Sequence, residues 1–256
     1  MSDTSTMNVK AVVSEAEWET RVNLAACYRL MPMFGMSDLV YNHITARIPG
    51  ETDRLLINPY GYMYEEITAS SLISINVAGD VLLNPHSNYD INPAGYVIHS
   101  AVHGARHDAQ CVIHTHSKAG MALSALKCGL LPLTQTAMRF GSIAYHDYEG
   151  PAVDLDERQR LVDDLGDNDA MILRNHGLLV ASADIPQAFN TIYWLEMACR
   201  AQVDAMACNT ELHYPTPEVI EKTAHLYKPG TRRPYGVMEW PAMLRMLDRR
   251  DSSFRS

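Results

Sequence analysis

The sequence has few cysteines and no paired cysteine motif. There are five, an odd number, and no two of them are spaced as a CxxC pair: Cys27, Cys111, Cys128, Cys199 and Cys208. A disulfide framework and a thiolate zinc site both need paired or clustered cysteines, so neither is indicated. We expect these cysteines to be reduced thiols in the core.

The sequence also lacks long hydrophobic runs and clusters of basic residues. No stretch approaches the roughly 18 consecutive apolar residues that a membrane span requires. The N-terminal segment is polar and acidic where a signal peptide would be basic and then apolar. The net charge is −9 and the Lys and Arg residues are scattered, whereas a nucleic-acid surface needs concentrated positive charge. We therefore expect a cytoplasmic protein that binds neither nucleic acid nor membrane.

What the chain does have is enough hydrophobic residues for one large core. With 256 residues, 47% of them hydrophobic, it can bury about three quarters of its unfolded surface. No internal repeat or low-complexity linker divides it. We expect a loosely attached, flexible segment at 1–12, one domain at 13–212, and a Pro- and aromatic-rich extension at 213–256 that packs on that domain or on a neighbouring subunit.

Alternating helical and strand-like segments predict a mixed α/β fold. Ser14 followed by Glu17 is typical of a helix N-terminus, and this helix should end at Gly35. Pro93 should open a second helix, because its missing N–H costs nothing at the first helical position. Further helices are expected at 118–126, 186–207 and 215–226. Segments rich in β-branched and aromatic residues predict strands at 39–49, 54–67, 71–84 with a turn at 78–80, 109–117, and on both sides of a loop within 169–182.

Three histidines form the first functional signal. His114 and His116 lie two residues apart in an apolar strand, so their side chains should project from the same face. A buried imidazole needs partners for its donor and its acceptor, and a metal ion is one such partner. His176 follows another apolar strand, and Gly177 permits a sharp turn there. Three neutral imidazoles suit divalent zinc, manganese or iron and leave positions open for a substrate; hydrogen-bonded core histidines are the alternative.

Five short motifs then follow one another along the chain: Tyr41-Asn42-His43-Ile44-Thr45-Ala46-Arg47, Ile57-Asn58-Pro59-Tyr60-Gly61, Asn92-Pro93-Ala94-Gly95 leading to His99, His114-Thr115-His116-Ser117, and Arg174-Asn175-His176-Gly177. In this order they resemble the class II aldolase/adducin family. The resemblance implies a three-layer α/β/α sandwich with a mainly antiparallel, mixed central sheet, and a homotetramer whose active sites lie near subunit interfaces. It also implies one divalent metal per subunit, held by His114, His116 and His176, and substrate contacts from Asn42, Asn58, Gly61 and Gly95.

Two departures from that family bear on the chemistry. Its sugar-phosphate aldolases have a glutamate, a metal ligand and acid/base, four residues before the position of His99, and two phosphate-binding serines just before that glutamate. Here Gly95 replaces the glutamate, and Pro93 and Ala94 replace the serines, so a phosphate group would be poorly held. The chain is therefore closer to the adducin-like branch, which includes adducin head domains and bacterial enzymes that decarboxylate aromatic acids or use iron(II) with oxygen.

We expect a metal-dependent carbon–carbon lyase acting on a small non-phosphorylated substrate. A decarboxylase of an aromatic or heteroaromatic carboxylic acid fits best, because carbon dioxide leaves without a base and only a proton donor is then needed. His99 and His43 are the candidates for that donor or for a substrate anchor, and Arg139 for a carboxylate clamp. His103 and His107 should be structural or exposed. The alternatives are an aldolase acting on a hydroxy-keto acid, a non-heme iron(II) oxygenase and a non-catalytic assembly module.

Overall fold

The computed structural model describes residues 7–150, 155–228, 230–231 and 233–256, and the side chains of 93–95 and 155–156 also lie outside the described residues. Helices and strands follow one another along the chain: α1 (Val9–Val12), α2 (Glu15–Met33), β1 (Ile44–Arg47), β2 (Arg54–Ile57), η1 (Tyr64–Glu66), η2 (Ala69–Ser71), β3 (Ile73–Asn76), β4 (Val81–Leu83), α3 (Pro93–Ala105), β5 (Cys111–Thr115), α4 (Lys118–Ser124), α5 (Gln135–Met138), β6 (Ala144–His146), α6 (Leu155–Leu165), β7 (Ala170–Leu173), β8 (Gly177–Ser182), α7 (Ile185–Ala207), α8 (Pro217–His225), α9 (Trp240–Arg250) and η3 (Ser252–Arg255).

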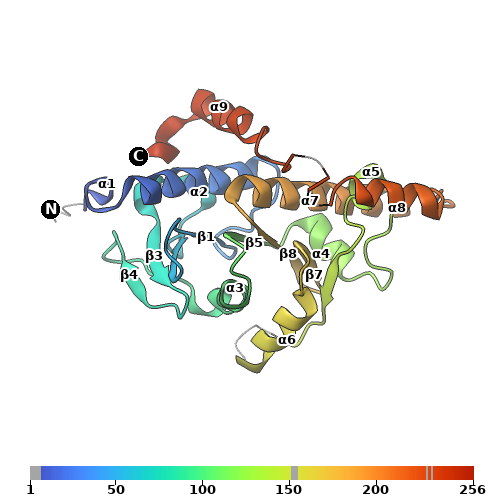
Figure 1. The fold of residues 1–256 in the computed structure, drawn as a ribbon, viewed down its shortest axis with the longest axis horizontal. Helices are drawn as coiled ribbons and strands as arrows, with labels where there is room; N and C mark the ends of the chain where they lie inside the picture. The colour runs from blue at the N-terminus through green and yellow to red at the C-terminus, as the bar shows by residue number, and fades with distance from the viewer. Residues whose placement is uncertain (1–6, 151–154, 229, 232) are drawn as a thin grey trace.

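The strands of the described residues form one central sheet in the order β4-β3-β2-β1-β5-β8-β7-β6. Neighbouring strands are antiparallel except for β6 and β7, which are parallel. Figure 1 shows α2 and α7 along one face of the sheet and α3 and α6 along the other. The predicted three-layer α/β/α sandwich with a mainly antiparallel sheet is confirmed.

The two faces of the sheet bury two different hydrophobic cores. In β5, Cys111 and Ile113 belong to the core under α2 and α7, whereas Val112 belongs to the core with α3 and α6. Leu178 and Leu179 of β8 divide between the two cores in the same way. Side chains alternate between faces along a strand, so the residue two after Val112 points to the α3 face. That residue is His114.

The helix α2 begins as its sequence predicts. The hydroxyl of Ser14 accepts a hydrogen bond from the backbone N–H of Glu17 at 3.1 Å, which satisfies one of the free N–H groups at the helix start. The Glu17 carboxylate does not complete a capping box; it pairs with Arg21 at 2.8 Å and with Arg54 at 3.3 Å. Glu17 and Arg21 are both buried, and the contact between Glu17 and Arg54 links α2 to β2 of the sheet.

The strand expected at 39–49 is much shorter than predicted. β1 covers only Ile44–Arg47, because Leu39 adopts a positive φ of 47° and the chain before β1 is a loop rather than an extended strand. Within the segment 1–12, residues 1–6 lie outside the described residues, while Val9–Val12 forms a short helix with Val9 buried. The sequence did not lead us to expect β6, α6 or α9.

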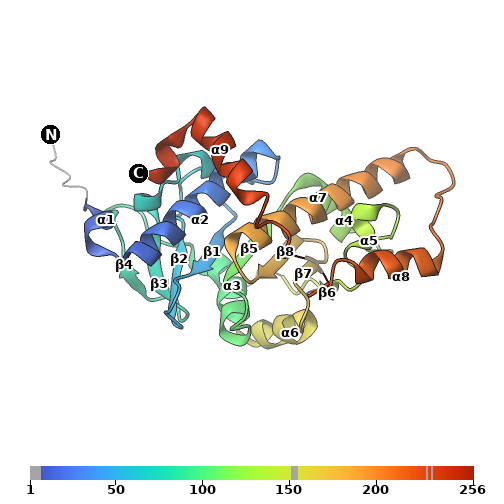
Figure 2. The ribbon, with the colours of Figure 1, turned by 45° about the horizontal axis from the view of Figure 1, so that its top comes forward.

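The C-terminal extension contacts two regions of the molecule. α9 lies on α2 (Figure 1), where the Trp240 indole N–H donates to the side-chain oxygen of Asn23 at 2.7 Å and Phe254 is buried. α8 lies beside α5, at the end of the molecule far from the N-terminus (Figure 2). No helix in the described part of the chain has the length and hydrophobicity of a membrane span. All five cysteines are free; three are buried as expected, but Cys128 and Cys208 are exposed.

Candidate metal centre

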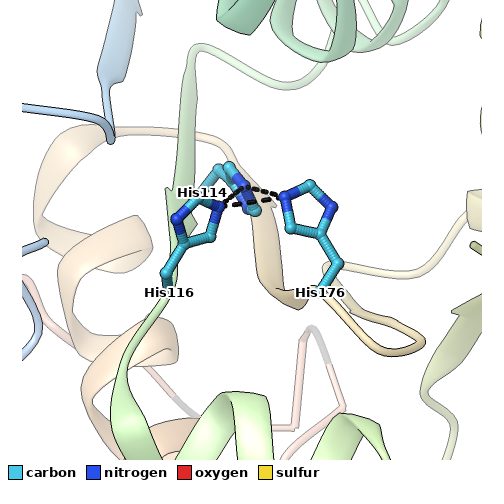
Figure 3. Close-up of side chains that lie close together, drawn as sticks. All are labelled: His114, His116 and His176. Carbon is cyan, nitrogen blue, oxygen red and sulfur yellow. Dashed lines mark hydrogen bonds between the residues drawn. The ribbon is translucent and has the colours of Figure 1, made fainter. Parts of the chain in front are cut away.

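The Nε2 atoms of three histidines converge on one point (Figure 3). The His114 and His116 nitrogens are 2.9 Å apart, those of His116 and His176 are also 2.9 Å apart, and those of His114 and His176 are 3.3 Å apart. His114 is the last residue but one of β5, and His116 lies one residue beyond the strand end. His176 comes from the β7–β8 loop. The structure therefore brings together the three histidines that the sequence singled out.

The other nitrogen of two rings is fixed by a hydrogen-bond acceptor. His114 Nδ1 lies 2.9 Å from the backbone oxygen of Leu178, and His116 Nδ1 lies 3.0 Å from a carboxylate oxygen of Asp38. Both oxygens only accept, so each Nδ1 carries the hydrogen. In a neutral ring Nε2 then presents its lone pair to the shared point, which is the orientation that outer hydrogen bonds give to metal-binding histidines.

Burial keeps at least two of these imidazoles neutral. Desolvation, followed by the neighbouring His176 and His116, holds the pKa of His114 well below its usual value. Desolvation and then the nearby His116 lower the pKa of His176 to about 4. Near neutral pH these two rings are therefore uncharged, which is the form that can donate a lone pair to a cation.

The spacing of the three nitrogens fits a first-row divalent cation. A cation bonded at about 2.0–2.1 Å needs its nitrogens roughly 3.3 Å apart in tetrahedral geometry and roughly 3.0 Å apart in octahedral geometry. The observed separations of 2.9–3.3 Å cover both cases. Without a cation, the lone pairs of His114 and His116 would face each other with no hydrogen between them. The donor set and its geometry therefore fit one divalent metal and do not decide which.

The loop that presents His176 depends on two neighbouring residues. Asn175 adopts the left-handed conformation, with φ of 55°, and so makes the turn that we expected of Gly177. Gly177 is needed for a different reason, because a Cβ there would lie 2.2 Å from the backbone oxygen of Thr115. The close approach of β8 to the end of β5 thus fixes His176 opposite His114.

A second group of histidines lies buried on the same side of β5. Thr45 Oγ1 lies 2.8 Å from His99 Nδ1 and 2.8 Å from His103 Nε2, and the rings of His43 and His99 are 5.0 Å apart between centroids. Burial, followed by the fields of His43, His114 and His103, keeps the pKa of His99 well below its usual value. His99 Nε2 has no hydrogen-bond partner among the described residues. His103, which we expected to be structural or exposed, is fully buried.

The four predicted substrate contacts differ in burial and in their hydrogen bonds. Asn42 is fully buried, and neither atom of its amide has a hydrogen-bond partner in the described part of the chain. Asn58 is already engaged, because its amide oxygen accepts from the Tyr28 hydroxyl at 2.9 Å. Gly61 sits in a turn with φ of 102°. Gly95 lies in the first turn of α3, and its surroundings fall outside the described residues.

Arg139 is not brought to the three histidines. It follows α5, where its guanidinium donates to the Asn190 side-chain oxygen at 2.7 Å and lies over the rings of Tyr227 and Tyr235. The cavity that it lines contains none of the three histidines. Within one chain Arg139 is therefore placed apart from the three histidines, and our expectation of a carboxylate clamp beside them is not met in this arrangement.

Two contributors to the centre were missed at the level of sequence. Asp38 lies 78 positions from His116, and an acidic residue in a loop carries no signal of such a contact. Thr45 belongs to one of the motifs, but only the structure shows that its hydroxyl joins His99 to His103. The helical spacing of His99 and His103 was a signal that could have prompted a search for one shared partner.

Comparison with known proteins places the chain in a family. The family model described as "Class II Aldolase and Adducin N-terminal domain" matches residues 22–203. The chain belongs to the class II aldolase and adducin family. A Pseudomonas aeruginosa protein with a provisional class 2 aldolase name is 45% identical over 252 residues, covering 97% of this chain and 96% of that protein. Mouse alpha-adducin is 41% identical over 244 residues; the match covers 89% of this chain but only 33% of the adducin.

Solved structures of the aldolase II superfamily share the whole fold. The crystal structure of an aldolase II superfamily protein from Pseudomonas syringae has a TM-score of 0.93 and 45% sequence identity, covering 98% of this chain and 100% of that one. An L-fuculose 1-phosphate aldolase from Glaciozyma antarctica has a TM-score of 0.82 and 26% identity, covering 99% of this chain and 98% of that one. The resemblance inferred from the five motifs is confirmed.

Proposed function

We propose that this class II aldolase and adducin family member is a metal-dependent carbon–carbon lyase, and specifically a decarboxylase of a small non-phosphorylated aromatic or heteroaromatic carboxylic acid. The observation that carries the proposal is the convergence of three Nε2 atoms within 2.9–3.3 Å of one another. Hydrogen bonds from the opposite side of two rings turn their lone pairs inward. Such a set of donors supports a site for a divalent cation.

His114, His116 and His176 would hold the metal, with Asp38 and the Leu178 carbonyl orienting two of them. When bound, a divalent cation supplies a Lewis acid that stabilises negative charge on a substrate oxygen. As the carbon–carbon bond breaks, carbon dioxide leaves and the electron pair stays on the substrate. A proton from the protein then replaces the carboxylate, so the reaction balances with no added oxidant or co-reactant.

His99 and His43 are the proposed proton donors or substrate anchors. The Thr45 hydroxyl has one hydrogen, so it donates to one of its two histidine neighbours and accepts from the other. If His103 Nε2–H donates to Thr45 and Thr45 donates to His99 Nδ1, then His99 presents an N–H at Nε2, the atom without a described partner. This series of hydrogen bonds would give His99 an N–H at Nε2 with which it could anchor a substrate oxygen.

The residues at the start of α3 favour decarboxylation over cleavage of a sugar phosphate. Gly95 offers no carboxylate, and Pro93 and Ala94 offer no hydroxyl for a phosphate. Asn42, buried with an unpartnered amide, remains a proposed substrate contact. An aldolase acting on a hydroxy-keto acid would use the same metal, and the similarity to an L-fuculose 1-phosphate aldolase makes aldol cleavage the nearest alternative reaction.

The histidines are open on one side. The cavity that borders His176 encloses only about 10 Å³, room for about one water molecule, and 21% of the His116 side chain is exposed. A substrate would therefore enter from this exposed side, and we propose that a neighbouring subunit of a homotetramer closes it. Light scattering after size-exclusion chromatography should give four chains; a stable monomer with full activity would contradict this arrangement.

The first experiment measures metal binding. The purified protein should bind about one equivalent of zinc, manganese or iron(II) per chain, as measured by elemental analysis after dialysis. His114→Ala should lose that metal, whereas His107→Ala, which changes an exposed histidine, is the matched control and should keep it. Less than about one tenth of an equivalent, with no gain on adding manganese or zinc, would defeat the proposal.

The second experiment identifies the reaction. Metal-loaded protein is mixed with a panel of aromatic and heteroaromatic carboxylic acids, with and without oxygen, and carbon dioxide release is recorded. Release in both conditions supports the decarboxylase. Release only with iron(II) and with consumption of oxygen would instead indicate a non-heme iron(II) oxygenase, which the same three histidines permit.

A non-catalytic assembly module is the candidate from another class, and the similarity to alpha-adducin over 89% of this chain favours it. Such a module needs no converging imidazoles. An inert screen combined with unchanged assembly of His114→Ala would support the module. A variant that still assembles but has lost both metal and carbon dioxide release would support the enzyme.

A further inference from the structure

A second cavity lies apart from the histidines. It has a volume of about 480 Å³ and is bounded by α5, α7 and the C-terminal extension, a size typical of small-molecule sites. Nearly half of its lining residues are aromatic, among them Phe189, Tyr193 and Trp194 from α7 and Tyr227 and Tyr235 from the extension. Flat aromatic walls around a space of this size suit a planar, apolar molecule.

One cation faces this cavity without an anion. The Arg139 guanidinium lies 5.4 Å and 5.0 Å from the ring centroids of Tyr227 and Tyr235. Its only hydrogen bond to a described residue is the one that Nη2 donates to Asn190 Oδ1 at 2.7 Å. No carboxylate of the described residues lies within 4.0 Å of it. Most N–H groups of the Arg139 guanidinium are therefore available to donate hydrogen bonds to a ligand.

The acidic residue in the cavity wall is already neutralised by another group. Glu239 accepts from Arg233 at 2.9 Å and from the backbone N–H of Gly236 at 2.9 Å, and the Arg233 contact lowers the pKa of Glu239. Burial lowers the pKa of Arg139, a sign that its charge is poorly solvated. A buried charge is costly unless an opposite charge meets it. Tyr227, Tyr235 and Glu239 oppose that shift, but no carboxylate of the described residues contacts the guanidinium, so a small anion can still be placed against it.

We infer that this cavity is a binding site for a small carboxylate with a planar aromatic body. The carboxylate would accept two parallel hydrogen bonds from Arg139, whose flat fork matches that geometry. Asn190 positions the guanidinium, and the aromatic side chains hold the ring. The site needs none of the three histidines and no metal, so it goes beyond the proposed lyase activity and can be tested separately from it.

Intrinsic tryptophan fluorescence can report binding in this cavity. The chain has three tryptophans, and two of them, Trp194 and Trp240, line the cavity. Benzoate is titrated into the whole protein after dialysis against a chelator, and intrinsic fluorescence is recorded. We expect a saturable change that fits one site per chain. Benzamide has the same ring without the charge, so it should bind at least tenfold more weakly.

Variants test whether Arg139 recognises the charge. Arg139→Gln should weaken benzoate binding at least tenfold. Arg139→Lys keeps the charge but loses the paired N–H groups of the guanidinium, so its affinity for benzoate should lie between those of Arg139→Gln and the unchanged protein. Asn190→Asp places a carboxylate beside the guanidinium and should also weaken binding at least tenfold. Arg249→Gln, an exposed arginine outside the cavity wall, is the matched control and should bind as the unchanged protein does.

Equal affinity for benzoate and benzamide would overturn the inference, and that comparison needs no variant. Unchanged benzoate binding in a folded Arg139→Lys or Asn190→Asp protein would overturn it as well. Binding that appears only after metal is added would assign the anion to the histidine centre instead. Loss of lyase activity, or its absence from the start, leaves the expected titration unaffected, so the two proposals fail independently.

Discussion

Asp38 should control how tightly the histidine centre binds metal. Asp38→Asn keeps the size of the side chain but replaces the carboxylate that lies 3.0 Å from His116 Nδ1. An amide carries no charge and can turn its NH2 toward the ring, so His116 Nε2 becomes a weaker donor with a less fixed orientation. Changes of this kind cost about 10–100-fold in metal affinity. The Asp38 side chain is 38% exposed, so solvent screens its charge and we expect about tenfold.

The assay is a competition for zinc between the protein and a coloured chelator at pH 7. The chain offers a close control, because His146 Nδ1 lies 2.7 Å from Asp164 in a similar pair outside the centre. Asp164→Asn should leave zinc affinity within about twofold. If Asp38→Asn also stayed within twofold, or if both variants weakened binding equally, the contact with His116 would not be an outer hydrogen bond of a metal ligand and the reasoning would fail.

Two further predictions concern stability. Burial and then the charge of Arg47 lower the pKa of His103 to about 3, whereas a histidine in the unfolded chain has a pKa near 6.5. Between these values only the unfolded state binds the proton. The free energy of unfolding should therefore decrease as the pH is lowered, by up to about 1.36 kcal/mol per pH unit. Metal-free urea unfolding between pH 6.5 and 5 should therefore lose about 2 kcal/mol more in the unchanged protein than in His103→Gln; parallel curves would contradict this. Gly177→Ala places a Cβ against Thr115 and should cost about 1–3 kcal/mol, whereas Gly104→Ala, with nothing closer than 3.9 Å, should not lower the melting temperature.

The histidine pair could be predicted from the sequence because strand periodicity is a local property. Val112 and His114 lie on one face of β5 for the same reason that Cys111 and Ile113 lie on the other. His176 lies 60 residues from His116; its place after an apolar strand and before Gly177 suggested it, and the family's motifs then linked it to the pair. The turn before β8 was attributed to the wrong residue, because Asn175 tolerates a positive φ nearly as readily as glycine does.

Contacts between segments that are far apart in the sequence could not be predicted from it. Arg139 carried the right chemistry for a carboxylate, but its location depends on α8 and the chain after it folding back to α5, which no local pattern encodes. α9 was missed although its sequence is amphipathic, with a proline in the first turn and Arg249 and Arg250 in the last; its packing on α2 through Trp240 is a contact between distant segments. Asp38 lies just before the segment 39–49 that we had predicted as a strand, and its contact with His116 depends on the loop that precedes β1.

The geometry of the candidate metal centre depends on the pairing of β5 with β8. β5 and β8 pair with His114 opposite Leu179 and Thr115 opposite Leu178, and the carbonyl of Leu178 is the group that fixes the His114 ring. The same pairing presses Gly177 onto Thr115 and so aims His176. A shift of one residue in this register would turn His114 into the core under α2 and α7 and remove its acceptor. The histidines can therefore meet only in a correctly paired sheet, and a bound metal would in turn hold that pairing closed.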